Sequence, residues 1–514
     1  MTKEIDYQNR DQGYMEKLWS QRTGVTTTMC MEEFSTELNY ALQTDKWIIS
    51  QSLGQFQLVG LREKIRELNQ ASIAKTIGNA GLNLTTDAVV HAMVADFEER
   101  FSKASNGYET YPLVFMPNTL QADKSKHRVV VLDGAEFPYD VIYYEWMNGL
   151  IYQGKNAFSV VREKRIEIPG QGTSHQRPDF AVYINGIPFM FIEYKTEESG
   201  LKEAIADLEN KSTYRKVPFY VATNGQECAV ICNVEQFNVK DSTNANAYLW
   251  KTSNRLPENE HLTDIECFYH DMLCQPENLY FYATQVTSLD HSRKIVKNGR
   301  VQQYQAVRNF HRHLEATRAK KVRTPSNLAV FHTQRSGKTV TMKFMAQLVL
   351  NHYNDLFQYI FIYAPDLQIK KVLSDEINAA GSSSLVSIDT IGGDSKLTFE
   401  QVLNQMNANA KKQTVGVKRI IIVNMQQLKI KAATAYAGFN VLNIIDEGHH
   451  GQAGEFAEVR DEVLPNATNV LFMATPKETT YSRYIGVGQK DNGNVLDRFT
   501  FTQAKAADIV VNVL

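Results

Sequence analysis

The chain has 514 residues, of which 43% are hydrophobic and 22% charged, and its formal net charge is −2. This length predicts two to four domains, and the composition is typical of a globular protein. The charge excludes a chain that is basic throughout, and no run of about 18 apolar residues is present to cross a membrane.

The five cysteines form no cluster that completes a zinc site, although Cys228 and Cys232 have the spacing C-x3-C. The start of the chain, MTKEIDYQNRDQG, is polar and does not resemble a secretory signal. Reduced cysteines are typical of a cytoplasmic protein, and the cytoplasm is the location that we expect.

The first 130 residues carry no chemical motif. Apolar residues recur at helical spacing in Leu61–Asn69 and Asp87–Phe101, which predicts two helices there. The segment Val129–Leu132 is apolar and rich in β-branched residues, so we expect a strand.

A hairpin is predicted farther along the chain, where the strands Phe180–Ile184 and Pro188–Tyr194 flank the turn dipeptide Asn185-Gly186. Asp179 precedes the first strand, and Glu193 and Lys195 end the second. Glu193 and Lys195 are two residues apart in a strand, so their side chains share one face.

The three charged residues of this hairpin predict a metal-dependent hydrolytic site. Two carboxylates on one face hold a hard cation such as Mg²⁺ through oxygen. Such a cation activates a water molecule and neutralises charge on a phosphate, and the Lys195 ammonium helps to orient or deprotonate that water. The alternative is an amphipathic hairpin that ends in surface charges.

The register of the hairpin decides between these alternatives. A two-residue turn pairs Ile184 with Ile187 and places Asp179 opposite Ile192, so that Glu193 points to the other face. An odd-length loop with Gly186 in the left-handed conformation places Asp179 and Glu193 on the same face. The chemistry therefore predicts an odd-length loop.

The segment after the hairpin region is polar and then basic. Residues 261–290 read as a connector. The segment bounded by Arg293 and Arg323 follows it and carries eight further basic residues, opposed only by Glu315: Lys294, Lys297, Arg300, Arg308, Arg312, Arg318, Lys320 and Lys321. This basic strip is either a solvated helix face or a surface beside a nucleic-acid path.

Short apolar strands alternate with helical stretches from about residue 291 onward, which predicts a parallel sheet covered on both faces. The predicted strands are Leu328–Phe331, Tyr359–Tyr363, Ile420–Val423, Val441–Ile445 and Val470–Met473. The first of them leads into FHTQRSGKT and a helix at Val340–Leu350, which is the context of a phosphate-binding loop.

The expected ATP site consists of this loop and a second motif, IIDEGH. Lys338 is expected to reach the β- and γ-phosphates, and the Thr339 hydroxyl and Asp446 to bind Mg²⁺. Glu447 is expected to orient or activate the attacking water as a catalytic residue. The remaining loop residues that we assign to ATP binding are Thr333, Gln334, Arg335, Ser336 and Gly337.

The motifs together resemble those of type I restriction endonuclease motor subunits. RPD, a strand, NG-x-P, a strand and E-x-K resemble the PD-(D/E)xK nucleases, and FHTQRSGKT with IIDEGH and MATP resembles the superfamily 2 helicases. The resemblance implies that Gln305 reads adenine. It also implies that Asn210 and Tyr214, in place of the family's Gln-x3-Tyr, are DNA-contact candidates.

The chain departs from the usual patterns at several points. His332 takes the first loop position, where phosphate-binding loops generally carry glycine although the type I family has similar HTQ sequences, and Arg335 stands where that family usually has glycine. At Arg335 a Cβ costs about 1–2 kcal/mol if φ is positive. The chain ends at Leu514, so we expect it to lack a second RecA-like domain and its arginine finger. An arginine finger is worth about 10³–10⁵ in rate, so ATP hydrolysis by this chain is expected to be latent.

The expected fold class is α/β, with a PD-(D/E)xK domain (a mixed sheet with flanking helices) before one RecA-like parallel-sheet domain. The expected domains are 1–260 with a nuclease core at about 140–240, the connector 261–290, and 291–514. The resemblance implies Mg²⁺ and ATP as cofactors, and double-stranded DNA with methyltransferase and specificity subunits as partners. The rivals are another helicase–nuclease of DNA repair or phage defence, and a non-catalytic ATP- or DNA-binding module.

Overall fold

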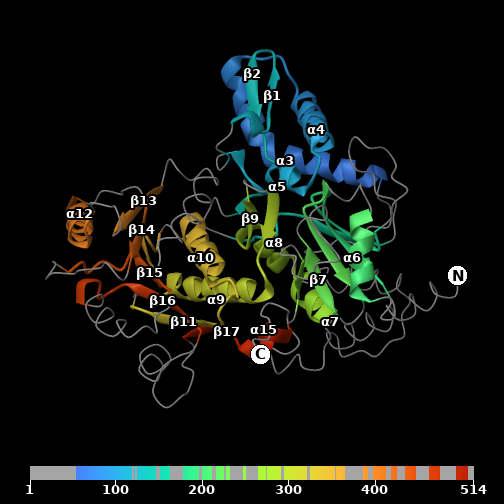
Figure 1. The fold of residues 1–514 in the computed structure, drawn as a ribbon. Helices are drawn as coiled ribbons and strands as arrows, with labels where there is room; N and C mark the ends of the chain where they lie inside the picture. The colour runs from blue at the N-terminus through green and yellow to red at the C-terminus, as the bar shows by residue number, and fades with distance from the viewer. Residues whose placement is uncertain are drawn as a thin grey trace. The chain divides into compact units, whose positions relative to one another are not determined.

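The structure is a computed structural model. It describes residues 54–118, 121, 124–145, 151–162, 178–195, 200–210, 216–224, 227–231, 247–250, 264–273, 275–290, 294–320, 324–353, 355–364, 386–391, 397–412, 418–424, 435–446, 462–474 and 494–506. The chain divides into two compact units, which are residues 1–145 with 151–298, and residues 299–514 with 146–150. Each unit is described by itself (Figure 1).

The first unit begins with helices and a small hairpin. These elements are α3 (Gly54–Ala80), α4 (Thr86–Lys103), α5 (Gly107–Phe115), the short 3₁₀ helix η2 (Lys124–Lys126), β1 (Val129–Leu132) and β2 (Ala135–Pro138). Both predicted helices and the predicted strand are confirmed. Helix α4 begins where Thr85 accepts a hydrogen bond from the Ala88 N–H, and it buries an apolar stripe from Val89 to Phe101.

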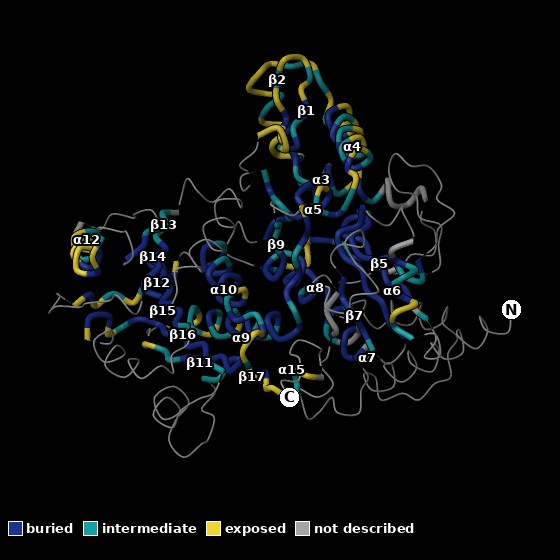
Figure 2. The backbone as a smooth tube through the Cα atoms, in the orientation of Figure 1, coloured by how far each residue is buried: buried dark blue, intermediate teal, exposed yellow. Residues whose placement is uncertain are grey.

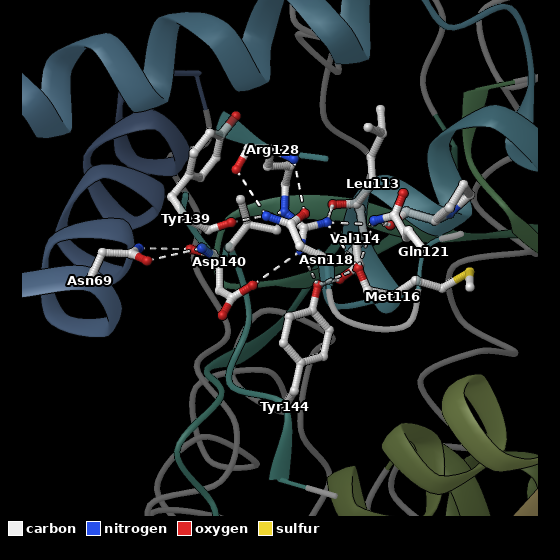
Figure 3. Close-up of polar contacts among 12 residues, drawn as sticks. Asn69, Leu113, Val114, Met116, Asn118, Gln121, Arg128, Tyr139, Asp140 and Tyr144 are labelled. Atoms are coloured by element: carbon white, nitrogen blue, oxygen red, sulfur yellow. Dashed lines mark hydrogen bonds and ion pairs between the residues drawn. The ribbon is translucent and has the colours of Figure 1, made fainter. Parts of the chain in front are cut away.

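The buried Arg128, which directly precedes β1, is hydrogen-bonded to the C-terminal end of α5 (Figure 3). The Arg128 guanidinium donates to the carbonyl oxygens of Leu113 at 2.8 Å and Met116 at 3.1 Å, at the C-terminal end of α5. It also donates to the Tyr144 hydroxyl at 2.9 Å and pairs with Asp140 at 3.2 Å. The cation thus satisfies helix carbonyls that have no intrahelical partner, which is favourable at a helix C-terminus.

A six-stranded mixed sheet forms the centre of the first unit, in the order β3-β4-β5-β6-β7-β8. Its elements are β3 (Phe158–Arg162), β4 (Phe180–Ile184), β5 (Ile187–Tyr194), α6 (Leu201–Asn210), β6 (Phe219–Thr223), β7 (Cys228–Ile231) and β8 (Ala247–Leu249). All neighbours are antiparallel except β5 and β6, which are parallel and are joined through α6. Helix α6 packs on these two strands through Ala204, Ile205 and Leu208.

Aromatic rings fill the core beside this sheet, and Figure 2 shows the buried backbone there. Phe189 of β5 makes edge-to-face contacts with Phe115, Phe158 and Phe219, with ring centroids 5.7 to 6.2 Å apart. Such contacts contribute about 0.5–1.5 kcal/mol per pair beyond the burial of apolar area. Helix α5, which Arg128 holds, therefore packs through Phe115 directly on β5, the hairpin strand that carries Glu193.

The described part of the expected connector is ordered secondary structure in the first unit. It contains α7 (Asp264–Phe268), the π-helix η7 (Tyr269–Leu273), α8 (Pro276–Gln285) and β9 (Thr287–Asp290), which pairs with β10 (Ile295–Asn298). Helix α8 buries Leu279, Tyr280 and Phe281, and the Tyr111 hydroxyl donates to the Ala283 carbonyl at 2.8 Å. Sequence analysis did not predict this apolar helix, because the residues around it are polar.

The second unit is a seven-stranded, all-parallel sheet in the order β13-β14-β12-β15-β16-β11-β17. Its elements are α9 (Val301–Arg318), β11 (Asn327–His332), α10 (Lys338–His352), β12 (Tyr359–Ala364), β13 (Val386–Ile391), α12 (Phe399–Lys412), β14 (Lys418–Asn424), β15 (Val441–Ile445), β16 (Thr468–Met473), β17 (Val495–Phe499) and α15 (Phe501–Ala506). All five predicted strands are confirmed. β13 and β17 were not predicted, because both carry polar residues and lie at the sheet edges.

Helices α9 and α10 pack side by side in this unit (Figure 1). The observed α/β architecture, a mixed sheet followed by a parallel seven-stranded sheet, agrees with the predicted class at this level. Within the described residues, no helix combines the length and the hydropathy needed to cross a bilayer.

Candidate functional site

The turn of the β4–β5 hairpin has two residues. Asn185 and Gly186 have φ of 51° and 84°, and Ile184 pairs with Ile187. Positive φ at both central positions is what a type I′ turn requires. The predicted left-handed Gly186 is confirmed, whereas the predicted odd-length loop is wrong.

A β-bulge supplies the odd residue instead. Tyr183 pairs with Pro188, but Val182 pairs with Met190, so Phe189 is an extra residue in β5. Beyond the bulge Phe180 pairs with Ile192, and continuing this register by one residue puts Asp179 opposite Glu193. Directly opposed residues of an antiparallel pair share a face, so the bulge brings the two carboxylates together.

The turn itself is buried and anchored, with Asn185 only 2% exposed. The Asn185 side chain accepts a hydrogen bond from the Ala157 N–H at 2.8 Å, and it donates to Asn156 Oδ1 at 3.0 Å and the Val141 carbonyl at 3.1 Å. The Asn185 N–H donates to the Ala157 carbonyl at 2.7 Å. These four bonds fix the turn and hence the register of both strands.

Lys195 lies directly after β5, where its N–H donates to the Thr223 carbonyl of β6 at 2.9 Å. Its ammonium pairs with Asp207 of α6, with Nζ and Oδ2 2.5 Å apart. Burial lowers the pKa of Lys195, but the hydrogen bond and charge of Asp207, then the charges of Glu193 and Asp179, raise it above its usual value. The four charged groups therefore form one electrostatic cluster.

The carboxylates of this cluster fit a hard divalent cation. Glu193 is 3% exposed and Asp179 is half-buried, so both are shielded from bulk water. Within the ranges that the structure describes, no group of three or more His, Cys, Asp or Glu residues is arranged to hold a metal ion. Mg²⁺ is commonly bound through one or two carboxylates and keeps several waters, so two protein carboxylates suffice for it.

The two DNA-contact candidates are at the edge of the described structure. Asn210 is the last residue of α6, and Tyr214 lies outside the described residues. Sequence reasoning missed Asp207, because a hairpin motif gives no signal for a residue on the following helix.

The phosphate-binding loop lies between β11 and α10. Gly337 precedes the first residue of α10, Lys338, and has φ 91°. The positive φ favours glycine at this position, and a Cβ there would also displace the end of the Gln303 side chain. Arg335 is exposed with φ 63°, which meets the condition stated for strain at that position.

Two glutamines at the start of α9 hold the loop backbone. Gln302 Nε2 donates to the Ser336 carbonyl, and Gln303 Nε2 donates to the Gly337 carbonyl, both at 3.0 Å. Gln303 Oε1 in turn accepts from the Arg300 N–H at 2.8 Å. Sequence reasoning singled out Gln305 and missed these two, although all three lie in VQQYQ of one helix.

The other end of the loop is fastened to the edge strand β17. His332 is fully buried, and its Nε2 lies 2.6 Å from Asp497 Oδ2. The Thr333 N–H donates to the Phe499 carbonyl at 3.0 Å. His332, one of the departures from glycine, thus has a structural partner that sequence could not reveal, since Asp497 lies on an unpredicted strand.

Asp446 follows β15 directly, and its N–H donates to the Tyr363 carbonyl at 2.9 Å. Strand β16 separates β15 from β11. Because all strands are parallel, Asp446 and the loop from Thr333 to Thr339 lie at the same carboxyl edge of the sheet, where α/β proteins bind ligands. Glu447 lies outside the described residues.

The basic strip has more acidic neighbours than the sequence suggested. Lys297 pairs with Asp290 at 2.6 Å, and Arg318 pairs with Asp355 at 2.8 Å and Glu315 at 3.0 Å. Arg318 also stacks on Tyr353, 4.5 Å from the ring centroid. These ion pairs favour a structural role for Lys297 and Arg318 over a contact with nucleic acid.

The chain therefore combines a mixed sheet that carries the carboxylate–lysine cluster with a parallel sheet that carries the predicted phosphate-binding loop. Residues 60–239 match the family model of the type I restriction enzyme R protein N terminus, and residues 302–514 match that of the SWI2/SNF2 ATPase. The two matches follow each other in the chain, and the resemblance to type I restriction endonuclease subunits is confirmed.

Relatives from two organisms are both described as type I restriction enzyme endonuclease subunits. The chain is 23% identical over 352 residues to a subunit assigned as the type I restriction enzyme MjaVIIIP endonuclease subunit of Methanocaldococcus jannaschii. It is 23% identical over 335 residues to the type I restriction enzyme SauCOLORF180P endonuclease subunit of Staphylococcus aureus strain COL. Each match covers 63% of this chain and 32% of the relative, so the chain spans about a third of the length of these relatives.

Solved structures of related systems align weakly. The type ISP restriction-modification enzyme LlaGI, a nuclease-deletion mutant with a DNA substrate mimic, aligns with TM-score 0.28 and 16% identity over 42% of this chain and 21% of its own. A fragment assigned as the HsdR subunit of a type I restriction enzyme from Vibrio vulnificus YJ016 aligns with TM-score 0.26 and 15% identity. That alignment covers 68% of this chain and 56% of the fragment.

Proposed function

We propose that the chain is the nuclease part and first motor part of a type I restriction endonuclease subunit, which cuts double-stranded DNA with Mg²⁺ and uses ATP for translocation. The observation that supports this proposal is the register of β4 and β5: Phe180 pairs with Ile192, so the next residues, Asp179 and Glu193, stand opposite each other when the register continues, and both act electrostatically on Lys195. The proposed architecture is a PD-(D/E)xK domain before one RecA-like domain, with the boundaries 1–260, 261–290 and 291–514.

In the proposed nuclease centre, Asp179 and Glu193 hold Mg²⁺, which when bound lowers the pKa of a coordinated water and neutralises phosphate charge. The low exposure of Glu193 removes competing water and strengthens electrostatic interactions in the site. Lys195, which pairs with Asp207, is proposed to orient or deprotonate the attacking water.

In the proposed nucleotide site, the loop from Thr333 to Thr339 surrounds the phosphates with backbone N–H groups at the N-terminus of α10. Lys338 supplies a cation, and the carboxylate of Asp446 with the Thr339 hydroxyl suits Mg²⁺. Glu447 is proposed to orient the attacking water, and Gln305 to contact adenine. Gln302 and Gln303 keep the loop open by occupying its carbonyl groups.

The proposed partners are double-stranded DNA and the methyltransferase and specificity subunits of a type I complex, with Asn210 and Tyr214 as DNA contacts. The relatives' names and the two matched regions support this assignment. A helicase–nuclease of another defence or repair system remains the second candidate, since the same two motif sets serve both.

Cleavage of plasmid DNA by the purified chain with Mg²⁺ tests the proposal. Glu193→Ala and Asp179→Ala are expected to abolish cleavage, while Lys338→Ala leaves metal-dependent cleavage intact because it lies in the other unit. Glu203→Gln, an exposed acid on α6, is the matched control for a lost negative charge. DNA binding without cleavage, with Mg²⁺ and with or without ATP, would instead identify a non-catalytic module.

A further inference from the structure

Asp207 lies outside the three-residue hairpin motif, yet it makes the direct contact with the motif's lysine. Its Oδ2 is 2.5 Å from Lys195 Nζ, and the two side chains are 34% and 27% exposed. Because both groups are partly buried, the pair is less screened by salt than a surface ion pair. Asp207 is held on α6, whose buried face (Ala204, Ile205 and Leu208) fixes the helix on β5 and β6.

The lysine needs such a partner because it has other carboxylates within reach. Asp179 and Glu193 both act electrostatically on the ammonium group. A lysine side chain carries a compact charge on a flexible four-carbon stem, so its ammonium group pairs with the nearby anion that attracts it most strongly. An ammonium that paired with Glu193 would occupy the carboxylate oxygens that a divalent cation requires.

We propose that Asp207 is a positioning residue of the nuclease centre, which holds the Lys195 ammonium against α6 and keeps it from pairing with Asp179 and Glu193. An ammonium group has three donors, so one bond to Asp207 leaves two for substrate or water. The three carboxylates and one ammonium also carry a net charge of −2, which matches a divalent cation. This inference rests on the proposed nuclease function.

The first test is calorimetric titration of the full chain with Mg²⁺ in the absence of nucleotide and DNA. Asp207→Asn is expected to weaken Mg²⁺ binding about tenfold, since the released ammonium competes at contact distance. Asp207→Glu restores the pair and is expected to bind Mg²⁺ within about twofold of the parent. Glu203→Gln removes the same charge from the same helix and controls for long-range electrostatics.

A double variant separates competition from simple loss of charge. If Lys195 competes for the carboxylates, Asp207→Asn with Lys195→Met binds Mg²⁺ more tightly than Asp207→Asn alone, because the competing ammonium is gone. If Asp207 only stabilises the helix, the double variant gains nothing over the single one. That result, or equal effects of Asp207→Asn and Glu203→Gln, overturns the inference.

Lysine acylation at neutral pH, followed by mass spectrometry, tests the Lys195–Asp207 ion pair in the absence of metal through the reaction rate of Lys195. Because the released ammonium pairs with Asp179 and Glu193, Lys195 is expected to stay as unreactive in Asp207→Asn as in the parent chain, and to react several-fold faster only in Asp207→Asn with Glu193→Gln, with exposed Lys202 of α6 as internal reference. A several-fold gain in Asp207→Asn alone contradicts the inference, because the ammonium would then have no second carboxylate to pair with. If the parent chain binds no Mg²⁺, or binds it equally well after Glu193→Gln, the nuclease proposal fails instead, so the two failures are distinguishable.

Discussion

The β4–β5 hairpin and the loop before α10 present their charged groups by opposite means. In the loop, the residues from Thr333 to Lys338 are consecutive in the chain, and side chains of α9 and the strand β17 hold their backbone in place. In the hairpin, Asp179 and Glu193 come from different strands, and they meet because a bulge at Phe189 changes the register. The composition of the loop is therefore a local property of the sequence, whereas the hairpin cluster depends on the packing of the whole first unit.

The largest effect is expected from the buried Arg128, which supports the helix that packs on β5. Arg128→Met leaves the carbonyls of Leu113 and Met116 without their donor and removes the cation beside the partly exposed Asp140, and each buried group left without its partner costs about 1–3 kcal/mol. We expect this loss in the free energy of unfolding by urea, with nucleotide affinity of the second unit unchanged. Lys126→Met, at an exposed position, is the control. A loss of nucleotide affinity in Arg128→Met as large as its loss of stability would show that the two units do not behave independently.

The two units are also expected to respond to pH in opposite directions. Burial raises the pKa of Glu145 in the first unit to about 7, although backbone N–H groups of Gln153 and Lys155 lower it. The unfolded group has a pKa near 4.5, so its contribution to stability is full below that pH and is lost as the pH rises through 7. At pH 8, Glu145→Gln should stabilise the first unit by on the order of 1–3 kcal/mol.

The second unit carries the opposite case in His311. Burial, with the charges of Arg312, Arg318 and Arg308, lowers its pKa from 6.5 to about 4. Its contribution is present above pH 6.5 and is lost as the pH falls through 4. Urea unfolding at pH 5 and pH 8, followed separately for each unit, tests both directions. A gain from Glu145→Gln at pH 4 as large as that at pH 8 contradicts the assignment.

Asn185 and Arg335 form a matched pair, because both have positive φ, and the Asn185 side chain is hydrogen-bonded within its turn. Asn185→Gly keeps the backbone conformation but removes three side-chain hydrogen bonds, each worth about 0.5–1.5 kcal/mol net. We expect a loss of about 2–3 kcal/mol in the free energy of unfolding. Asn185→Asp keeps the acceptor for the Ala157 N–H but buries a carboxylate against the acceptor oxygens of Asn156 and Val141, so it should lose at least as much.

The smallest effect is expected at Arg335, and its sign is reversed. Glycine removes a left-handed strain of about 1–2 kcal/mol, and its greater freedom in the unfolded chain offsets about 0.5–1 kcal/mol of that. Arg335→Gly should therefore stabilise the second unit by about 0.5–1 kcal/mol in a thermal or urea melt. A destabilised variant would mean that the arginine makes a stabilising contact, and its ATP affinity would then be measured.

Much of this protein was predictable because its periodicities are strong. Alternating apolar strands and helices predicted the parallel sheet, and the residues after Phe331 predicted a loop at a helix start, since both signals lie in consecutive residues. The Asn185-Gly186 turn and the left-handed Gly186 were also predictable, because glycine and asparagine tolerate that conformation at low cost.

Only the tertiary structure decided the rest, because it depends on pairing between residues far apart in the chain. A bulge is set by how Phe189 packs among Phe115, Phe158 and Phe219, so strand parity read from the turn alone was wrong. Asp207 reaches Lys195 because α6 crosses from β5 to β6, and Asp497 reaches His332 because β17 adds to the sheet edge beside β11. A sequence states which side chains are present, but the packing of helices and the register of strands determine which of them meet.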